Sequence, residues 1–444
     1  MKITVIGAQK SGVAAARLAR RKGADVFVTE INEPDKYNIA IELFKELGVG
    51  YEFGGHTARA LECDLIVASP GVRPSNEIIK TAEGRGIKII SELEYASQFI
   101  TNPICAITGT NGKTTVTSLI EYILNNSGKK AYACGNIGAP LSDFVDKIEP
   151  EAILVCEVSS FQLDRVEKFR PQVAVILNIT PDHLYYHGTM EEYAGAKWKI
   201  NCNQNENNLL ILNNDDPLLG ESLVETKANI MRFSMSRVDW GIYPENGSII
   251  IANGNRQKEE TLMKTCELAL PGAHNLYNSM AAALAARAFE VRNEDIRDSL
   301  MSFKGVEHRL EHVRTLHGVD YVNDSKATNI NATWYALSSY SKPIVWLAGG
   351  RGDSNNYAEL DKFVAENVKA IVAIGEERDA IFNHFCASVR CVKADTLEEA
   401  VIRCAELAEE GDVALFSPAC KSFDMFANYE HRGACFKEIV NSLD

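Results

Sequence analysis

A glycine-rich segment that ends in lysine and threonine is the part of this chain best suited to chemistry. The segment follows the apolar run 104–107, and apolar residues with helical spacing come after it at positions 116, 119, 120, 123 and 124. A strand, a glycine loop and a helix in this order typically bind phosphate, because backbone N–H groups curl around the phosphate oxygens at the start of the helix. Ile107 stands where the general motif has its first glycine. We therefore expect a variant ATP-binding loop formed by Gly109, Thr110, Asn111, Gly112, Lys113, Thr114 and Thr115.

Three further polar side chains could work with such a loop. Glu157 ends the apolar run 152–156, and His183 follows the run 173–177 after a short polar segment. Side chains at the carboxyl ends of parallel strands lie at the edge where these sheets bind ligands. Lys197 lies in a stretch with helical character. Taken alone, each has an ordinary alternative: a solvated acid, a structural histidine and a solvated lysine.

Several segments of the chain resemble one family. The segment GTNGKTT is similar to the loop of the Mur ligases and of the related folylpolyglutamate synthetases, which phosphorylate a carboxylate and then let an amine attack it. The segments EVSSFQL (157–163) and SPACKSFD (417–424) resemble those of the glutamate-adding branch of the Mur ligase family. The resemblance runs from Gly7 to about Arg432. It implies an ATP-dependent ligase that adds D-glutamate to UDP-N-acetylmuramoyl-L-alanine through an acyl phosphate in peptidoglycan precursor synthesis.

The resemblance also implies roles for the metal and catalytic residues. Mg²⁺ would be bound by Thr114, Glu157, His183 and Lys197, with His183 at a second metal position. Lys197 matches a lysine that is carbamylated in this family, and Lys199 is the alternative if the register slips by two residues. The implied catalytic residues are Lys113, His183, carbamylated Lys197 and Lys326.

Other motifs carry the implied substrate contacts. For ATP they are Asn275 and Asn278 in GAHNLYN, Arg309 in GVEHRLE and Asp324 in NDSKATN. For the UDP-sugar and the reacting groups they are Ser11, Glu30, Ser69, Asn136, Ser159 and Thr328. For the incoming amino acid they are Ser422 and Phe423, with Tyr429 as a weaker neighbour.

The predicted glutamate pocket departs from the family pattern. Asp353 stands where the family usually has a lysine that pairs with the side-chain carboxylate of glutamate. Arg351 and Lys421 could each replace the lost charge. We expect Arg351 to do so, because its planar fork suits a carboxylate and its length spans the offset of two residues. The sequence does not decide between D- and L-glutamate.

These residues must be positioned by an α/β fold with three domains. Residues 1–97 alternate apolar runs with helical patterns and predict a Rossmann-like domain that binds the UDP-sugar. Residues 98–305 predict a central P-loop ATPase-type α/β domain, with a type I′ hairpin near Asn253-Gly254. Residues 306–444 predict a C-terminal Rossmann-like domain that binds ATP and the amino acid.

The composition and charge of the chain disfavour several classes of protein and partner. The 444 residues carry a formal charge of −14, which disfavours nucleic acid and anionic lipid as partners. The start of the chain has no signal-peptide pattern, and no apolar run approaches the ~20 residues of a membrane span. The 11 cysteines form no CxxC pair and predict reduced thiols. We expect a cytoplasmic monomer.

Three alternatives remain at this stage. The chain could be a sister ligase that extends a longer nucleotide peptide or a folate, or one that adds L-glutamate. From its first block alone it could be a nicotinamide-dependent dehydrogenase, although it lacks GxGxxG. It could also be an inactive nucleotide-binding partner, which the presence of Lys113, Glu157, His183 and Lys197 disfavours.

Overall fold

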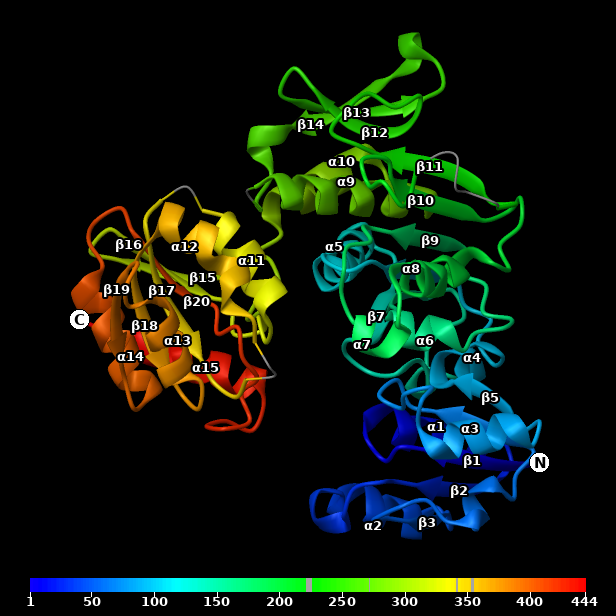
Figure 1. Ribbon diagram of the computed structural model, residues 1–444. Coiled ribbons are helices and arrows are strands. Elements are labelled where there is room, and N and C mark those ends of the chain that lie inside the picture. The colour runs from blue at the N-terminus through cyan, green and yellow to red at the C-terminus, as the bar shows by residue number, and fades with distance from the viewer. Residues whose placement is uncertain (221–225, 271, 341, 353–354) are drawn as a thin grey trace. The chain divides into compact units, whose positions relative to one another are not determined.

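The computed structural model describes residues 1–220, 226–270, 272–340, 342–352 and 355–444. The chain forms two compact units, Met1–Phe303 and Lys304–Asp444. The first unit contains a five-stranded and a nine-stranded sheet, and the second contains a six-stranded sheet (Figure 1). This is the expected α/β fold class.

The first sheet is entirely parallel, with the order β3-β2-β1-β4-β5. Ile3 and Val5 pack on one face with α1, α2 and α4, whereas Ile6 and Ile66 pack on the other face with α3. The order of the strands reverses between β1 and β4, which is where open α/β sheets bind ligands. The elements are β1 (Lys2–Ile6), α1 (Lys10–Arg21), β2 (Asp25–Thr29), α2 (Asn38–Glu46), β3 (Gly50–Glu52), β4 (Leu65–Ala68), α3 (Glu77–Gly84), β5 (Lys88–Ser91) and α4 (Glu92–Ser97).

The second sheet has the order β14-β13-β12-β11-β10-β9-β6-β8-β7, and it is parallel from β7 to β12. Its strands are β6 (Ile104–Thr108), β7 (Ala131–Gly135), β8 (Ile153–Glu157), β9 (Val173–Ile176), β10 (Leu209–Asn213), β11 (Asn229–Phe233), β12 (Trp240–Glu245), β13 (Ser248–Asn253) and β14 (Glu260–Lys264). Its helices are α5 (Lys113–Asn126), α6 (Ser160–Asp164), α7 (Leu184–His187), α8 (Met190–Trp198), α9 (Ala273–Ala288) and α10 (Asn293–Ser302).

The predicted hairpin near Asn253-Gly254 is confirmed, because β13 and β14 pair antiparallel, but its turn is not of type I′. Asn253 ends β13 without a positive φ, and Gly254 begins a six-residue connection to β14. The two-residue turn lies instead at Asn246-Gly247, between β12 and β13, with φ of 51° and 74°. Both Asn-Gly pairs match the turn pattern, but a type I′ turn requires a positive φ at both residues.

The third sheet has the order β15-β16-β20-β17-β18-β19, with only the β15–β16 pair antiparallel. Helices α11 to α13 pack on one face, and α14 and α15 pack on the other. The elements are β15 (Glu311–Leu316), β16 (Val319–Asn323), α11 (Ile330–Ser338), β17 (Ile344–Gly349), α12 (Asp361–Asn367), β18 (Val368–Ile374), α13 (Arg378–Phe385), β19 (Arg390–Lys393), α14 (Leu397–Leu407), β20 (Val413–Phe416) and α15 (Tyr429–Ser442).

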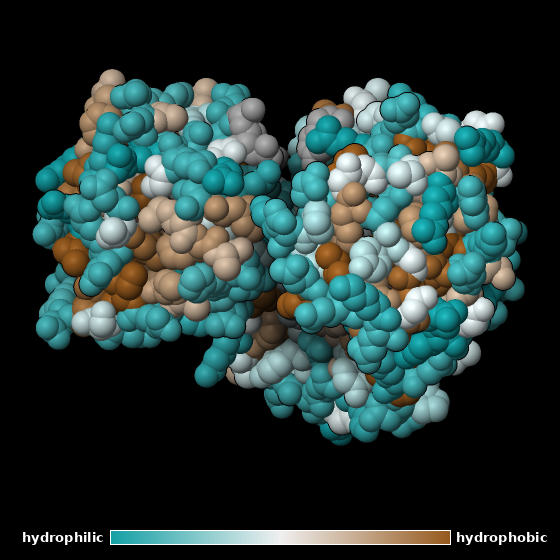
Figure 2. All heavy atoms as spheres, turned by 90° about the horizontal axis from the view of Figure 1, so that it is seen from below, coloured by the Kyte–Doolittle hydropathy of each residue, from teal (hydrophilic) through white to brown (hydrophobic). Residues whose placement is uncertain are grey.

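The face drawn in Figure 2 is mostly polar. Hydrophilic side chains cover most of each unit on this face, and hydrophobic side chains form smaller groups among the hydrophilic ones. Within the described ranges, no helix has the length and hydrophobicity needed to cross a membrane.

Candidate active site

The glycine loop connects β6 to α5, as its sequence predicts. Gly112 is the N-cap of α5 and has a φ of 85°, in the left-handed region that favours glycine. A Cβ at Gly112 would lie 2.5 Å from Oδ1 of Asn278, so the loop packs directly against α9. The Lys113 ammonium folds back and donates to the carbonyl oxygens of Gly109 (2.8 Å) and Thr110 (2.7 Å). The predicted nucleotide residue Asn278 thus contacts the loop, and it donates to Asn275 Oδ1 at 3.3 Å.

Residues without a predicted role hold the loop in place. Asn178, after β9, accepts from the Asn111 N–H (2.8 Å) and donates to the Asn111 carbonyl (3.1 Å). The Thr110 hydroxyl donates to the Thr180 carbonyl (3.1 Å) and lies 3.0 Å from the Tyr193 hydroxyl. The motifs that contain Asn178 and Tyr193 were visible in the sequence, but their partners lie 67 and 83 residues away.

Glu157 is a suitable ligand for a divalent cation. It is the last residue of β8, pairs in register with Ile107 of β6, and is 2% exposed. Its Oε1 accepts from Asn136 Nδ2 at 2.8 Å. Its Oε2 is buried and has no hydrogen-bond partner among the described residues. A buried carboxylate oxygen without a partner is costly unless a ligand or ion satisfies it.

His183 lies close to both candidate lysines. It is the N-cap of α7, with a φ of 55°, and its Nε2 is 3.4 Å from Asp182 Oδ2. Burial lowers the pKa of His183, and the positive charges of Lys113 and Lys197 lower it further against the effect of Asp182. The imidazole is therefore favoured in the neutral form that binds metals.

Lys197 is almost fully enclosed, at 1% exposure. Its ammonium donates to the Gly109 carbonyl (2.8 Å) and lies 4.5 Å from the centre of the Tyr193 ring. Burial lowers the pKa of Lys197 well below its usual value. The positive charge of Lys113 lowers this pKa further, whereas the negative charge of Asp182 raises it. Desolvation of this kind favours the neutral amine, which is the nucleophile that carbamate formation requires.

Two segments near Glu157 have clear local functions. Ser159 caps α6 in a capping box with Gln162, so its hydroxyl is already used in the fold. His187, for which no role was predicted, stacks on Phe161 at 5.6 Å and lies 3.0 Å from the Ser160 hydroxyl. The predicted substrate contact of Ser159 remains a prediction.

Three of the predicted UDP-sugar residues, Ser11, Glu30 and Ser69, lie where the strand order of the first sheet reverses. Ser11 is in the first turn of α1, and Ser69 follows β4. The Ser69 hydroxyl is buried without a partner among the described residues, and a Cβ on Gly7 would lie 2.6 Å from it. Glu30 is 5% exposed, and its carboxylate accepts from the N–H groups of Ala8 and Asn32. Glu30 thus shapes this turn.

In the second unit, Asp324 follows β16 at the level where β20 and β17 also end. Its Oδ2 accepts from the Ser417 hydroxyl (2.8 Å), and its Oδ1 accepts from the Leu310 N–H (3.2 Å). Burial raises the pKa of Asp324 to about 7. Lys326 lies 5.8 Å from the centre of the Tyr429 ring, and the partly buried Thr328 follows it.

The two candidate cations for the glutamate carboxylate are direct neighbours. The backbones of Arg351 and Lys421 exchange two hydrogen bonds, of 2.8 and 2.9 Å. The Arg351 guanidinium makes two hydrogen bonds to Glu376, at 3.0 and 2.7 Å, which the sequence did not predict. Asp353, which stands where the family usually has a lysine, lies outside the described residues. Of the other pocket residues, Ser422 is 2% exposed and Phe423 is 60% exposed.

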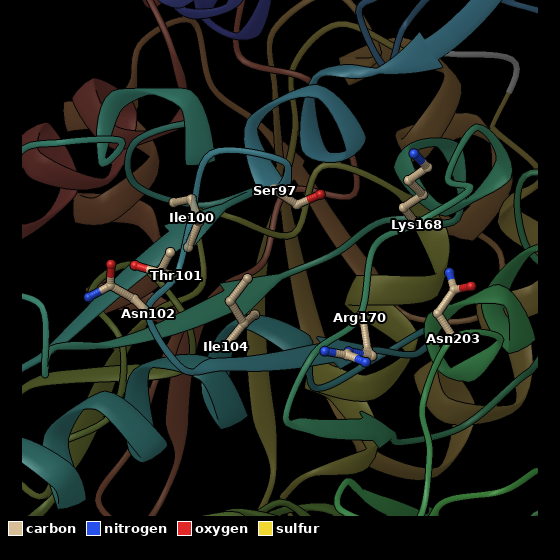
Figure 3. Close-up of a pocket in the computed structure, with 8 residues that line it drawn as sticks. All are labelled: Ser97, Ile100, Thr101, Asn102, Ile104, Lys168, Arg170 and Asn203. Atoms are coloured by element: carbon tan, nitrogen blue, oxygen red, sulfur yellow. The ribbon is translucent and has the colours of Figure 1, made fainter.

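A cavity of about 620 Å³ lies in the first unit, away from the glycine loop (Figure 3). It is lined by Ser97, Ile100, Thr101, Asn102, Ile104, Lys168, Arg170 and Asn203. Ile104 begins β6, whereas the glycine loop follows the end of β6, so the cavity is at the opposite edge of the sheet. The amides of Asn102 and Asn203 are already bonded to backbone carbonyls.

Known proteins resemble this chain over its full length. Three family models match: the MurD N-terminal domain at residues 2–78, the Mur ligase middle domain at 107–286, and the Mur ligase glutamate ligase domain at 308–420. The UDP-N-acetylmuramoylalanine--D-glutamate ligase of Salinibacter ruber is 46% identical, over 99% of this chain and 97% of the relative. The enzyme of that name from Pelotomaculum thermopropionicum is 42% identical, over 100% and 98%.

Solved structures show the same fold at lower identity. The UDP-N-acetylmuramate-alanine ligase of Thermotoga maritima has a TM-score of 0.60 and 20% identity, covering 100% of this chain and 99% of that chain. The MurF ligase of Thermotoga maritima in complex with ADP has a TM-score of 0.59 and 18% identity, covering 94% and 95%. The chain therefore belongs to the Mur ligase family, and within it to the UDP-N-acetylmuramoylalanine--D-glutamate ligases.

Proposed function

We propose that this chain adds D-glutamate to UDP-N-acetylmuramoyl-L-alanine with ATP, and that the glycine loop, Glu157 and Lys197 form the centre of the reaction. One observation carries the proposal: a phosphate loop and a buried carboxylate oxygen without a partner among the described residues lie at the ends of adjacent strands, and a desolvated lysine on α8 is bonded to the same loop. Such a site can hold the phosphate of ATP next to a substrate carboxylate, and it can stabilise the negative charge that accumulates there.

Mg²⁺ fits this centre. Glu157 would supply the open oxygen, Thr114 a hydroxyl, His183 an imidazole whose lowered pKa favours the neutral form, and Lys197 an anionic group once it is carbamylated. Carbamylation forms a bond between the Lys197 nitrogen and the carbon of carbon dioxide, and the nitrogen loses a proton to solvent. When bound, Mg²⁺ neutralises the crowded oxygen anions of ATP and carboxylate.

The reaction has two steps, formation of the acyl phosphate and attack of the amine on it, and the side chains of this protein act differently in each. Lys113 leaves the Gly109 and Thr110 carbonyls to bind phosphate, while the substrate carboxylate attacks the terminal phosphorus and ADP leaves. The amine of glutamate then attacks the acyl carbon, the carbon–nitrogen bond forms, phosphate leaves, and the amine loses a proton. Arg309, Asp324 and Lys326 serve ATP and the acyl phosphate from the second unit, with Asn275 and Asn278 at the loop.

The remaining contacts are proposals of the same kind. The UDP-sugar substrate is held by Ser11, Glu30, Ser69, Asn136 and Ser159, and glutamate is held by Thr328, Arg351, Ser422 and Phe423. The domain bounds 1–97, 98–305 and 306–444, the monomeric state and the cytoplasmic location remain predictions from the sequence.

One assay tests the proposed function. ADP release is measured with each of three acceptors, UDP-N-acetylmuramoyl-L-alanine, the longer nucleotide tripeptide and a folate, and with D- or L-glutamate. We expect release only with UDP-N-acetylmuramoyl-L-alanine and D-glutamate, and none in the Lys113→Ala variant. Release with the tripeptide or the folate instead would show that the chain is a sister ligase, and release with L-glutamate would correct the stereochemistry.

A further inference from the structure

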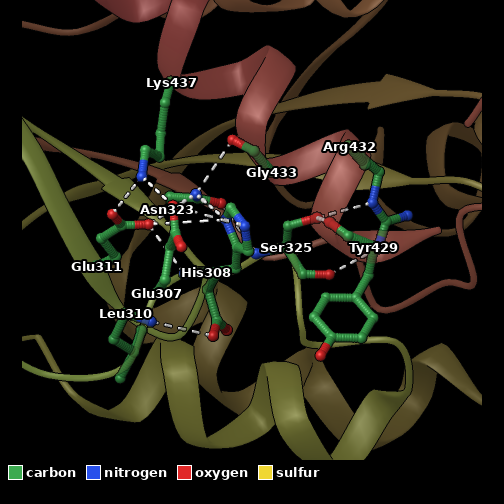
Figure 4. A network of polar contacts seen from close by, with 11 residues as sticks. Glu307, His308, Leu310, Glu311, Asn323, Ser325, Tyr429, Arg432, Gly433 and Lys437 are labelled. Atoms are coloured by element: carbon green, nitrogen blue, oxygen red, sulfur yellow. Dashed lines mark hydrogen bonds and ion pairs between the residues drawn. The ribbon is translucent and has the colours of Figure 1, made fainter. Parts of the chain in front are cut away.

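Helix α15 holds together two segments of the second unit that carry candidate ATP residues. One is the turn 307–311 before β15, which contains Arg309, and the other is the segment 323–326 after β16 (Figure 4). The α15 residues Tyr429, Gly433 and Lys437 are spaced four apart and therefore lie on one face of the helix. This face contacts both segments.

The turn around Arg309 is conformationally strained. His308 and Leu310, on either side of Arg309, have φ of 63° and 43°. Side-chain-bearing residues rarely adopt this left-handed region, and such a conformation persists only where its surroundings hold it. The Arg309 guanidinium has no hydrogen bond or ion pair among the described residues, and its charge acts on Asp324, so the backbone of the turn is the main constraint on its direction.

Buried contacts hold the His308 side of the turn. Asn323 Nδ2 lies 2.9 Å from His308 Nδ1 and donates to Glu311 Oε2 (3.0 Å) and to the Gly433 carbonyl (3.2 Å). A Cβ on Gly433 would lie 2.3 Å from His308 Nδ1, so the helix backbone packs directly on the ring. Because His308 is 6% exposed, its ring has little room to move.

Lys437 joins the two ends of the turn. Its ammonium donates to Glu307 Oε1 (2.6 Å) and Glu311 Oε1 (2.8 Å), while Glu311 Oε2 accepts from the His308 N–H (2.9 Å). Ligand atoms of Glu307, His308 and Glu311 lie within 4.8 Å of one another, as in a metal site, but the ammonium already supplies the positive charge there. Without it, the two carboxylates would repel each other across the turn.

We propose that Lys437 is a positioning residue for the ligase reaction: it fixes the turn 307–311 and thereby directs Arg309 toward ATP. The proposal rests on the proposed contact of Arg309 with ATP. The Lys437 ammonium is bonded to Glu307 and Glu311, so it acts through the turn.

The test compares Lys437→Met with Lys369→Met. Lys369 is a matched control, because it also joins two carboxylates, Glu409 (2.9 Å) and Asp412 (2.7 Å), and its side chain is 30% exposed against 27% for Lys437. We expect KM for ATP to rise about 10-fold or more in Lys437→Met, since small misplacements of a catalytic contact have large effects. It should change less than about 2-fold in Lys369→Met, and Lys437→Arg should restore most of the affinity. If Lys437→Met does not fold, Lys437→Gln serves in its place.

A double-mutant cycle with Arg309→Ala separates positioning from general destabilisation. If Lys437 acts through Arg309, Lys437→Met should have no further effect on KM for ATP in the Arg309→Ala background. Equal losses in Lys437→Met and Lys369→Met, or additive effects in the cycle, would overturn the proposal. An unchanged KM for ATP in Arg309→Ala would also overturn the positioning role of Lys437, because it would show that Arg309 does not contact ATP. In that case, D-glutamate-dependent ADP release would still support the proposed function.

Discussion

Replacing Lys197 with methionine should stabilise the protein and abolish its activity. Methionine keeps an unbranched stem of similar length, so little or no cavity forms in a site that is 1% exposed. The lost hydrogen bond to the Gly109 carbonyl costs only about 0.5–1.5 kcal/mol, because that oxygen still accepts from Lys113 at 2.8 Å. Removing a buried amine avoids a desolvation penalty of several kcal/mol. We expect a net stabilisation of about 1–3 kcal/mol.

The stabilisation should depend on pH. The pKa of Lys197 is lowered in the folded protein, so the unfolded chain binds more protons at this residue below its own pKa of about 10.4. The stability of the unsubstituted protein therefore rises with pH through this range, and the advantage of Lys197→Met shrinks. Thermal unfolding from pH 6 to 10, in metal-free buffer without bicarbonate, measures both effects. A gain of 1–3 kcal/mol corresponds to a rise of a few degrees in Tm.

Lys197→Ala is a matched control for the loss of activity in Lys197→Met. Alanine leaves space for a short carboxylate such as acetate in place of the carbamate, whereas methionine fills it. We expect acetate to restore part of the activity of Lys197→Ala and none of that of Lys197→Met, and bicarbonate depletion to slow the unsubstituted enzyme. Normal activity of Lys197→Met, or an unmodified Lys197 in a fully active enzyme, would refute the carbamate.

Three further predictions test other parts of the molecule. Lys113→Ala should lower kcat on the order of 10³-fold with little change in thermal unfolding, and an unchanged kcat would exclude its phosphate contact. Arg351→Ala should raise KM for D-glutamate about 10- to 150-fold without changing KM for ATP. Glu376→Gln should lower that KM, because the internal carboxylate no longer competes for Arg351; a selective rise in Lys421→Ala instead would transfer the contact to Lys421. Burial raises the pKa of Glu92 to about 7 in the folded protein, whereas its pKa in the unfolded chain is about 4.3. The free energy of unfolding therefore falls as pH rises through this window. Glu92→Gln should thus raise Tm more at pH 8 than at pH 5, and equal shifts at both would contradict this.

The sequence alone determined the approximate bounds of several strands and the position of the glycine loop. The apolar runs 104–107, 152–156 and 173–177 form β6, β8 and β9 to within one residue at each end, since buried parallel strands are short apolar runs between helical patterns. The glycine loop was equally clear, because its glycines, Lys113 and the following helix are neighbours in the chain. The turn at Asn246-Gly247 was missed because two Asn-Gly pairs fit the same local pattern.

Only the tertiary structure decided which distant side chains meet. Arg351 is paired with Glu376, 25 residues away, and Lys437 with Glu307, 130 residues away. The order of the strands and the faces of the helices set these pairs, and neither follows from local periodicity. The same holds for Lys197, whose type suggests a solvated charge. Its burial beside Gly109 lowers its pKa, because desolvation depends on everything packed around it rather than on its neighbours in the chain.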